Sequence, residues 1–82
     1  MTIIKAVMFC KLGISVINKV IEELKKIEQI KKIMSLTGDY DLLAEIEVET
    51  SEELFDIFAN QIDLINGIVQ SNTHLIMKSW EK

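Results

Sequence analysis

Two carboxylates, a phenol and a glycine follow one another near the middle of the chain, in the segment Thr37-Gly38-Asp39-Tyr40-Asp41. Gly38 and Asp39 supply the backbone freedom and the local hydrogen bonding that a tight connection between two strands requires. Tyr40 and Asp41 add an aromatic edge and a second carboxylate, groups that can together hold a small polar ligand. The segment is therefore the first candidate for a binding site. Its alternative interpretation is a well-made hairpin turn without a ligand.

The other reactive side chains favour structural roles. Cys10 and His74 are the single cysteine and the single histidine, so they assemble neither a disulfide nor a zinc site, and no metal or cofactor is expected. We interpret Cys10 as a small buried hydrophobe and His74 as a hydrogen-bonded interface residue. The alternating acids at 45, 47 and 49 indicate a solvated or ion-paired strand face, and Met77 and Trp80 indicate packing or interface anchors. No catalytic residue is expected.

The composition indicates one small domain that needs a partner. With 82 residues the chain lies near the lower limit for a stable single core, whereas 49% of the residues are hydrophobic. Nine lysines without any arginine, and a net charge of −4, argue against direct binding of nucleic acid. The apolar start of the chain is interrupted by Lys5, so it resembles neither a secretory signal nor a membrane span. We expect a cytoplasmic protein with no membrane partner.

The pattern of apolar residues predicts six elements in the order strand, helix, strand, strand, helix, strand. Residues 2–10 are rich in strand formers, and a helix from about 14 to 26 is expected to begin at Ser15 as N-cap. Residues 30–37 and 41–49 form a predicted antiparallel hairpin. Thr50 with Glu53 predicts the capping box of a second helix that Asn66-Gly67 ends, and a last strand runs from Ile68 to about Trp80.

This order predicts an α+β, ferredoxin-like fold in which two helices lie on one face of a four-stranded antiparallel sheet. The other sheet face is then uncovered, and the first strand is apolar on both faces. We therefore expect a second copy to pack sheet to sheet on it, which gives a symmetric dimer of the dimeric α/β barrel type.

Two motifs resemble a known family. Residues 36–43, Leu-Thr-Gly-Asp-Tyr-Asp-Leu-Leu, and residues 65–73, Ile-Asn-Gly-Ile-Val-Gln-Ser-Asn-Thr, are similar to the effector-binding or RAM domain of the Lrp/AsnC transcriptional regulators. The resemblance covers essentially residues 1–82 and implies face-to-face dimers that assemble into larger rings, often octamers. The family's transcription factors carry an N-terminal helix-turn-helix domain. The chain begins within the effector domain, so we expect a stand-alone form that does not bind DNA directly.

The resemblance also implies a ligand and the residues that bind it. Amino-acid effectors of the family sit at contacts between dimers near this turn, which implies binding by Gly38, Asp39, Tyr40 and Asp41, with Ser71 and Thr73 as hydroxyl candidates. Asp39 or Asp41 would accept from the α-ammonium of the amino acid. The hydroxyls of the last strand and N–H groups near Gly38 would donate to its carboxylate.

The resulting hypothesis is a non-enzymatic module that binds a free amino acid, forms homo-oligomers and modulates transcription, alone or with full-length Lrp/AsnC relatives. The first alternative is a purely structural partner that joins such relatives in mixed oligomers. The second is a small dimeric α/β-barrel enzyme, which rests on fold analogy alone.

Overall fold

The computed structural model describes residues 2–82 and contains the six predicted elements in the predicted order. The strands are β1 (Ile4–Leu12), β2 (Ile30–Ser35), β3 (Leu42–Val48) and β4 (Ile68–Leu75). The helices are α1 (Ile17–Lys25) and α2 (Ser51–Asn60), and a short 3₁₀ turn, η1 (Ile62–Leu64), follows α2.

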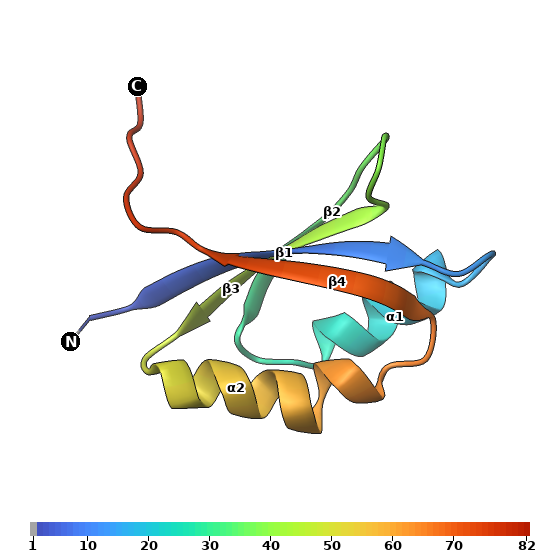
Figure 1. Ribbon diagram of the computed structural model, residues 1–82, viewed down its shortest axis with the longest axis horizontal. Helices are drawn as coiled ribbons and strands as arrows, with labels where there is room; N and C mark the ends of the chain where they lie inside the picture. Colours follow the sequence, from blue (N-terminus) through green and yellow to red (C-terminus); the bar gives the residue numbers. More distant parts are fainter. Residues whose placement is uncertain (1) are drawn as a thin grey trace.

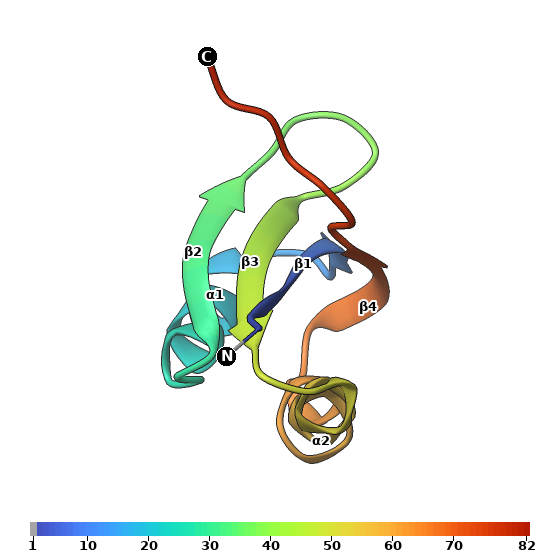
Figure 2. The ribbon, with the colours of Figure 1, turned by 90° about the vertical axis from the view of Figure 1, so that its left-hand side faces the viewer.

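The strands form one antiparallel sheet in the order β2-β3-β1-β4. Both helices lie on the same face of this sheet (Figures 1 and 2). The predicted ferredoxin-like arrangement is therefore confirmed, with β1 and β3 in the centre and β2 and β4 at the edges.

The core lies between this sheet face and the helices. Every second residue of the two central strands is buried, because side chains alternate between the faces of a strand. Val20 and Leu24 of α1 and Ile57 of α2 close the core from the other side. The strand residues in the core are Ala6, Met8, Cys10, Leu42, Ala44, Ile46 and Val48.

The first helix begins later than the sequence predicted. Its N-cap is Val16, which makes no side-chain cap bond, and Ser15 has a φ of 61°. The prediction of Ser15 as N-cap is therefore wrong, because the chain needs a left-handed residue at this position to turn from β1 into α1. Ser15 therefore lies outside the helix, one residue before its N-cap.

The second helix has the predicted start but not the predicted end. Thr50 Oγ1 accepts from Glu53 N–H at 3.1 Å, and Glu53 Oε1 accepts from Glu49 N–H at 2.7 Å, which confirms the capping box in a form shifted by one residue. The helix ends at Asn60 rather than at Asn66-Gly67. Ile62 nevertheless stays buried, because η1 continues the apolar stripe in a tighter turn.

The last strand ends at Leu75, five residues earlier than predicted. Ile76 N–H still donates to Lys5 C=O at 2.8 Å, but residues 76–82, here called the tail, then leave the sheet. Alternation of side chains indicated a strand over this segment, yet alternation does not show whether a neighbouring strand is present to accept the backbone hydrogen bonds.

The sheet face away from the helices is here called the open face. Its centre is apolar, with Val7 and Phe9 of β1 beside Leu43 of β3. Residues 36–41, which connect β2 to β3, and the tail both rise on this side of the sheet (Figures 1 and 2). They therefore stand on the open face, while the helices cover the opposite one.

Candidate binding site

The connection between β2 and β3 is fastened to β1 through Asp41. Leu36 N–H donates to Asp41 C=O, and Asp41 N–H donates to Cys10 C=O, both at 2.9 Å. The Asp41 side chain adds a third bond, because its Oδ2 accepts from Leu12 N–H at 2.9 Å. One carboxylate oxygen of Asp41 is therefore committed to holding the hairpin in place.

Gly38 gives the hairpin its backbone shape. Its φ is +102°, a conformation that residues with a Cβ rarely adopt. A Cβ at this position would meet nothing within 4 Å, so the glycine serves the turn and not a crowded contact. Asp39 beside it is exposed, which leaves its carboxylate available to a ligand.

Tyr40 folds back onto the open face. Its ring lies 5.4 Å from that of Phe9, and Lys11 Nζ lies 5.8 Å from the centre of the Tyr40 ring. Asn72 of β4 donates its amide hydrogen to the Tyr40 hydroxyl. Lys11, Tyr40 and Asn72, which these contacts join, and Asp39 and Asp41, which flank Tyr40 in the chain, are here together called the hairpin cluster, at one end of the open face.

Ser71 and Thr73 lie on the other side of the sheet. Ser71 pairs with Cys10 and Thr73 pairs with Met8, two residues whose side chains are buried on the helix face. Paired residues in antiparallel strands point to the same face, so both hydroxyls face α2 and not Tyr40. Within one chain the structure brings together Gly38, Asp39, Tyr40 and Asp41, but it does not bring Ser71 and Thr73 to them.

Sequence reasoning missed Lys11 and Asn72 as members of this cluster. Side chains alternate along β4, so Asn72 lies on the other sheet face from Ser71. This alternation was visible in the sequence. Lys11 was harder to find, because its position depends on how β1 pairs with both of its neighbours. The cluster offers an ammonium group at Lys11 and carboxylates at Asp39 and Asp41, which match the two charged groups of a free amino acid.

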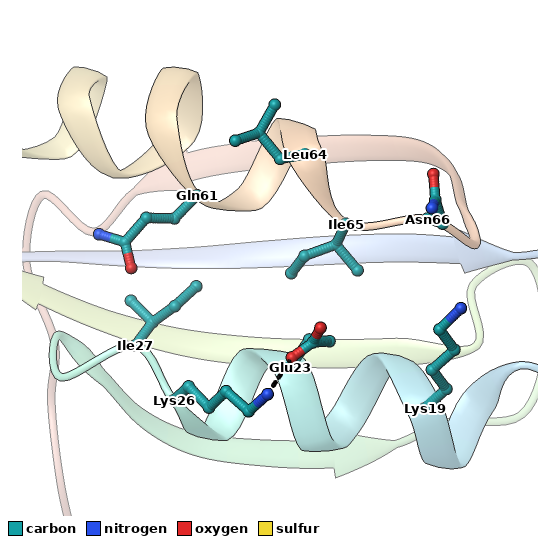
Figure 3. Close-up of a pocket in the computed structure, with 8 residues that line it drawn as sticks. All are labelled: Lys19, Glu23, Lys26, Ile27, Gln61, Leu64, Ile65 and Asn66. Atoms are coloured by element: carbon teal, nitrogen blue, oxygen red, sulfur yellow. Dashed lines mark ion pairs between the residues drawn. The ribbon is translucent and has the colours of Figure 1, made fainter.

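Two of the surface hollows elsewhere on the molecule lie beside the helices. One of about 350 Å³ separates α1 from the chain after α2, and its apolar floor is formed by Ile27 and Ile65 (Figure 3). Lys26 Nζ lies 2.7 Å from Glu23 Oε2 at its side. This hydrogen-bonded ion pair lowers the pKa of Glu23, and the two charges satisfy each other rather than a ligand.

The second hollow, of about 470 Å³, is here called the α2/β4 groove. It is formed by Ser51, Leu54, Phe55 and Phe58 of α2 with Ser71, Thr73 and Leu75 of β4. The hydroxyls of Ser71 and Thr73 therefore line an otherwise largely apolar groove.

The single cysteine and the single histidine lie in different surroundings. Cys10 is fully buried, as predicted, and burial raises its pKa to about 11. The His74 ring packs edge-on against Phe9 at 6.0 Å and is otherwise exposed. Among residues 2–82, no three His, Cys, Asp or Glu side chains gather as a metal site would require. No helix in this described part of the chain has the length and apolar character to cross a membrane.

Residues 6–82 match the family model of the Lrp/AsnC ligand binding domain. The HTH-type transcriptional regulator FL11 of Pyrococcus abyssi is 33% identical over 64 residues, which cover 78% of this chain and 42% of the regulator. Homocitrate synthase of Sulfolobus acidocaldarius is 36% identical over 52 residues, which cover 63% of the chain and 11% of that enzyme. The chain thus spans less than half the length of these relatives.

Solved structures share the fold. The protein TTHA0845 from Thermus thermophilus superposes with a TM-score of 0.87 and 24% identity, over 96% of this chain and 99% of that one. AsnC of E. coli superposes with a TM-score of 0.88 and 14% identity, over 93% of this chain and 52% of that one. A regulator from Neisseria meningitidis, described as a complex with L-Met, superposes with a TM-score of 0.81 and 12% identity, over 96% of this chain and 53% of that one.

Proposed function

The chain belongs to the family of Lrp/AsnC ligand-binding domains, and from this premise we propose that it is a non-enzymatic module that binds a free amino acid and assembles with copies of itself in the cytoplasm. The observation that carries the proposal is the hairpin cluster, in which opposite charges stand at the end of an uncovered apolar sheet face. The Neisseria regulator, described as a complex with L-Met, supports the proposal because it has the same fold.

The hairpin cluster suits both ends of an amino acid. Lys11 supplies an ammonium group for the α-carboxylate, while exposed Asp39 and the second oxygen of Asp41 supply acceptors for the α-ammonium. Charge-assisted hydrogen bonds contribute about 1.5–3 kcal/mol each, so three of them support roughly micromolar to millimolar binding after the ordering costs. Ser71 and Thr73 remain predicted ligand residues that a hairpin can reach only in a contact between subunits.

The open face supports the proposed assembly. Val7, Phe9 and Leu43 form an apolar centre that no element of residues 2–82 covers. Around it, the strand register places Lys5 opposite Glu47 and Lys32 opposite Glu45 on neighbouring strands. An apolar centre with a balanced charged rim is the composition of a protein interface, and a second copy packed face to face would bury it.

The ligand proposal is tested by calorimetric titration with each of the twenty amino acids. We expect saturable binding of at least one, and a loss of tenfold or more in affinity for Asp39→Asn and Lys11→Met. Asp63→Asn, which removes a comparable exposed charge in η1, is the matched control and keeps wild-type affinity. If no amino acid binds, or if the control weakens binding equally, the ligand proposal is wrong.

The assembly proposal is tested separately by sedimentation. Wild type is expected to sediment as a dimer or larger oligomer, and Phe9→Asp as a monomer, because a buried unpaired carboxylate is strongly unfavourable. Ile14→Asp introduces the same charge at a residue that is 94% exposed in the turn before α1, and it leaves assembly unchanged. A wild type that sediments as a monomer at every concentration would refute the proposal.

The third part of the proposal is a role in the regulation of transcription. The chain matches 42% of the FL11 regulator, so the same interface would let it join full-length family members in mixed oligomers. Co-expression with a helix-turn-helix regulator of this family tests the point. We expect a mixed species that Phe9→Asp abolishes.

A further inference from the structure

The α2/β4 groove is apolar and open to solvent. Phe55 is 72% exposed on the α2 side, and Leu75 is 57% exposed on the β4 side. The strand that forms one wall is an edge of the sheet, since β4 pairs with β1 alone. A groove of about 470 Å³ with these walls is large enough for an aromatic side chain.

Two apolar side chains of the tail lie mostly in solvent, whereas Ile76 at its base is only 39% exposed. Met77 is 97% exposed and Trp80 is 80% exposed. Lys78 Nζ, in the same tail, lies 5.5 Å from the centre of the Trp80 ring. Burying a tryptophan removes about 150–250 Å² from water. An exposed tryptophan in a segment that projects from the body indicates that the segment packs against another chain.

We infer that the tail of one copy docks in the α2/β4 groove of a second copy, with Trp80 between the two walls. The inference rests on the proposed face-to-face dimer. In one chain the tail rises on the open face (Figures 1 and 2), whereas the groove lies on the helix side, because α2 forms one of its walls. A tail would therefore have to reverse around β4 to enter its own groove. In a face-to-face dimer the partner lies on the side to which the tail points.

The length of the tail fits this path. Seven extended residues span at most about 23–25 Å. Packed sheets are separated by about 10 Å, so the tail crosses to the partner's sheet and has roughly as much length again to reach the layer between that sheet and its helices.

The charges and the polar groups of the groove also fit the tail. The α2 helix beside the groove contains the acids Glu52, Glu53 and Asp56 and no basic residue, whereas the tail contains two lysines, Lys78 and Lys82, and one acid, Glu81. A buried indole N–H needs an acceptor, and the hydroxyls of Ser71 and Thr73 line the groove. Docking of the tail would then place Ser71 and Thr73, the two residues that family resemblance suggested for effector binding, at a contact between subunits.

The first test uses the fluorescence of the single tryptophan. In the dimer we expect blue-shifted emission that shifts to the red on dilution into monomers, and Trp80→Ala should raise the dimer dissociation constant tenfold or more. Phe55→Ala in the groove should do the same, whereas Leu64→Ala, at a side chain that is 71% exposed on η1, should not. Solvent-exposed emission from an intact dimer would overturn the inference and leave the face-to-face dimer standing.

The second test asks whether docking occurs between chains. Chains carrying Phe55→Cys are mixed with chains carrying Trp80→Cys under mild oxidation, at a protein concentration high enough to keep the weakened dimer formed, and a mixed disulfide is expected. Buried Cys10, with its raised pKa, stays unreactive. No mixed disulfide from a dimeric sample, or an intrachain disulfide in the double variant, overturns the inference. A wild type that is monomeric at every concentration overturns the assembly proposal itself.

Discussion

At the scale of single residues, the two aspartates of the hairpin have different tasks. Asp41 holds the hairpin to β1 through Leu12 N–H, whereas Asp39 is exposed at the tip. We expect Asp41→Ala to lower the free energy of unfolding by about 1–2 kcal/mol, since it removes a charged acceptor and frees the hairpin. Asp39→Ala should change it by less than about 0.5 kcal/mol. Urea unfolding at one protein concentration measures both, and equal effects would contradict the division of tasks.

Two glycines permit a second prediction of the same kind. Gly38 and Gly67 both have positive φ, at 102° and 112°. A Cβ on Gly38 meets open space, but one on Gly67 would lie 2.9 Å from Val16 Cγ2 and 3.0 Å from Val20 Cγ2. Gly38→Ala should therefore cost about 1–2 kcal/mol of backbone strain, and Gly67→Ala roughly 1–3 kcal/mol more from overpacking. Thermal unfolding of the pair tests the order, which equal losses would refute.

At the scale of elements, the start of α2 couples stability to pH through Glu53. Hydrogen bonds from Glu49 N–H and the Gln29 amide lower the pKa of Glu53 in the folded chain. The unfolded chain therefore binds this proton at higher pH. The stabilisation is present above the unfolded pKa of about 4.3, and it is lost as pH falls through the lower folded pKa.

Glu53→Gln should accordingly destabilise the protein at pH 7, and the difference from wild type should shrink as pH falls from about 5 to 3. Glu52→Gln removes the same charge from the same helical turn and is the matched control. Unfolding measured across this range decides the point. A Glu53→Gln difference that does not change with pH would show that the hydrogen bonds to Glu53 contribute no charge-dependent stability.

The elements also show how far the sequence alone could reach. Element order, the Thr50 cap and the buried alternation of β3 were predictable because each depends on neighbours in the sequence. The ends of α1 and β4 were not, because Ser15 takes a left-handed conformation and β4 stops where its pairing with β1 stops. The candidate binding site likewise combines features that depend on sequence neighbours with features that depend on strand pairing. The hairpin was found from its motif, whereas Asn72 and Lys11 join it only through the register of three strands.

At the scale of the whole molecule, one sheet face carries the features on which the proposed ligand binding and assembly both depend. The open face has an apolar centre at Phe9, the hairpin cluster stands at one end of it, and the tail rises beside it. In the proposed face-to-face dimer, a ligand bound at the hairpin would therefore lie beside the contact between subunits. This arrangement gives a physical route by which binding of an amino acid changes assembly, since a ligand that prefers one assembly state shifts the equilibrium toward that state.

Assembly of this kind makes thermal stability depend on concentration. With about 0.7 kcal/mol of unfolding enthalpy per residue, two chains of 82 residues absorb roughly 115 kcal/mol when a dimer unfolds to two chains. Mass action then raises the Tm of wild type by about 4 °C for each tenfold increase in protein concentration. Phe9→Asp should unfold at one temperature over the same range, because its folded form is a monomer. A scanning calorimetry series at three concentrations separates the two cases, and a wild-type Tm that does not move with concentration would exclude a dimer whose unfolding is coupled to dissociation.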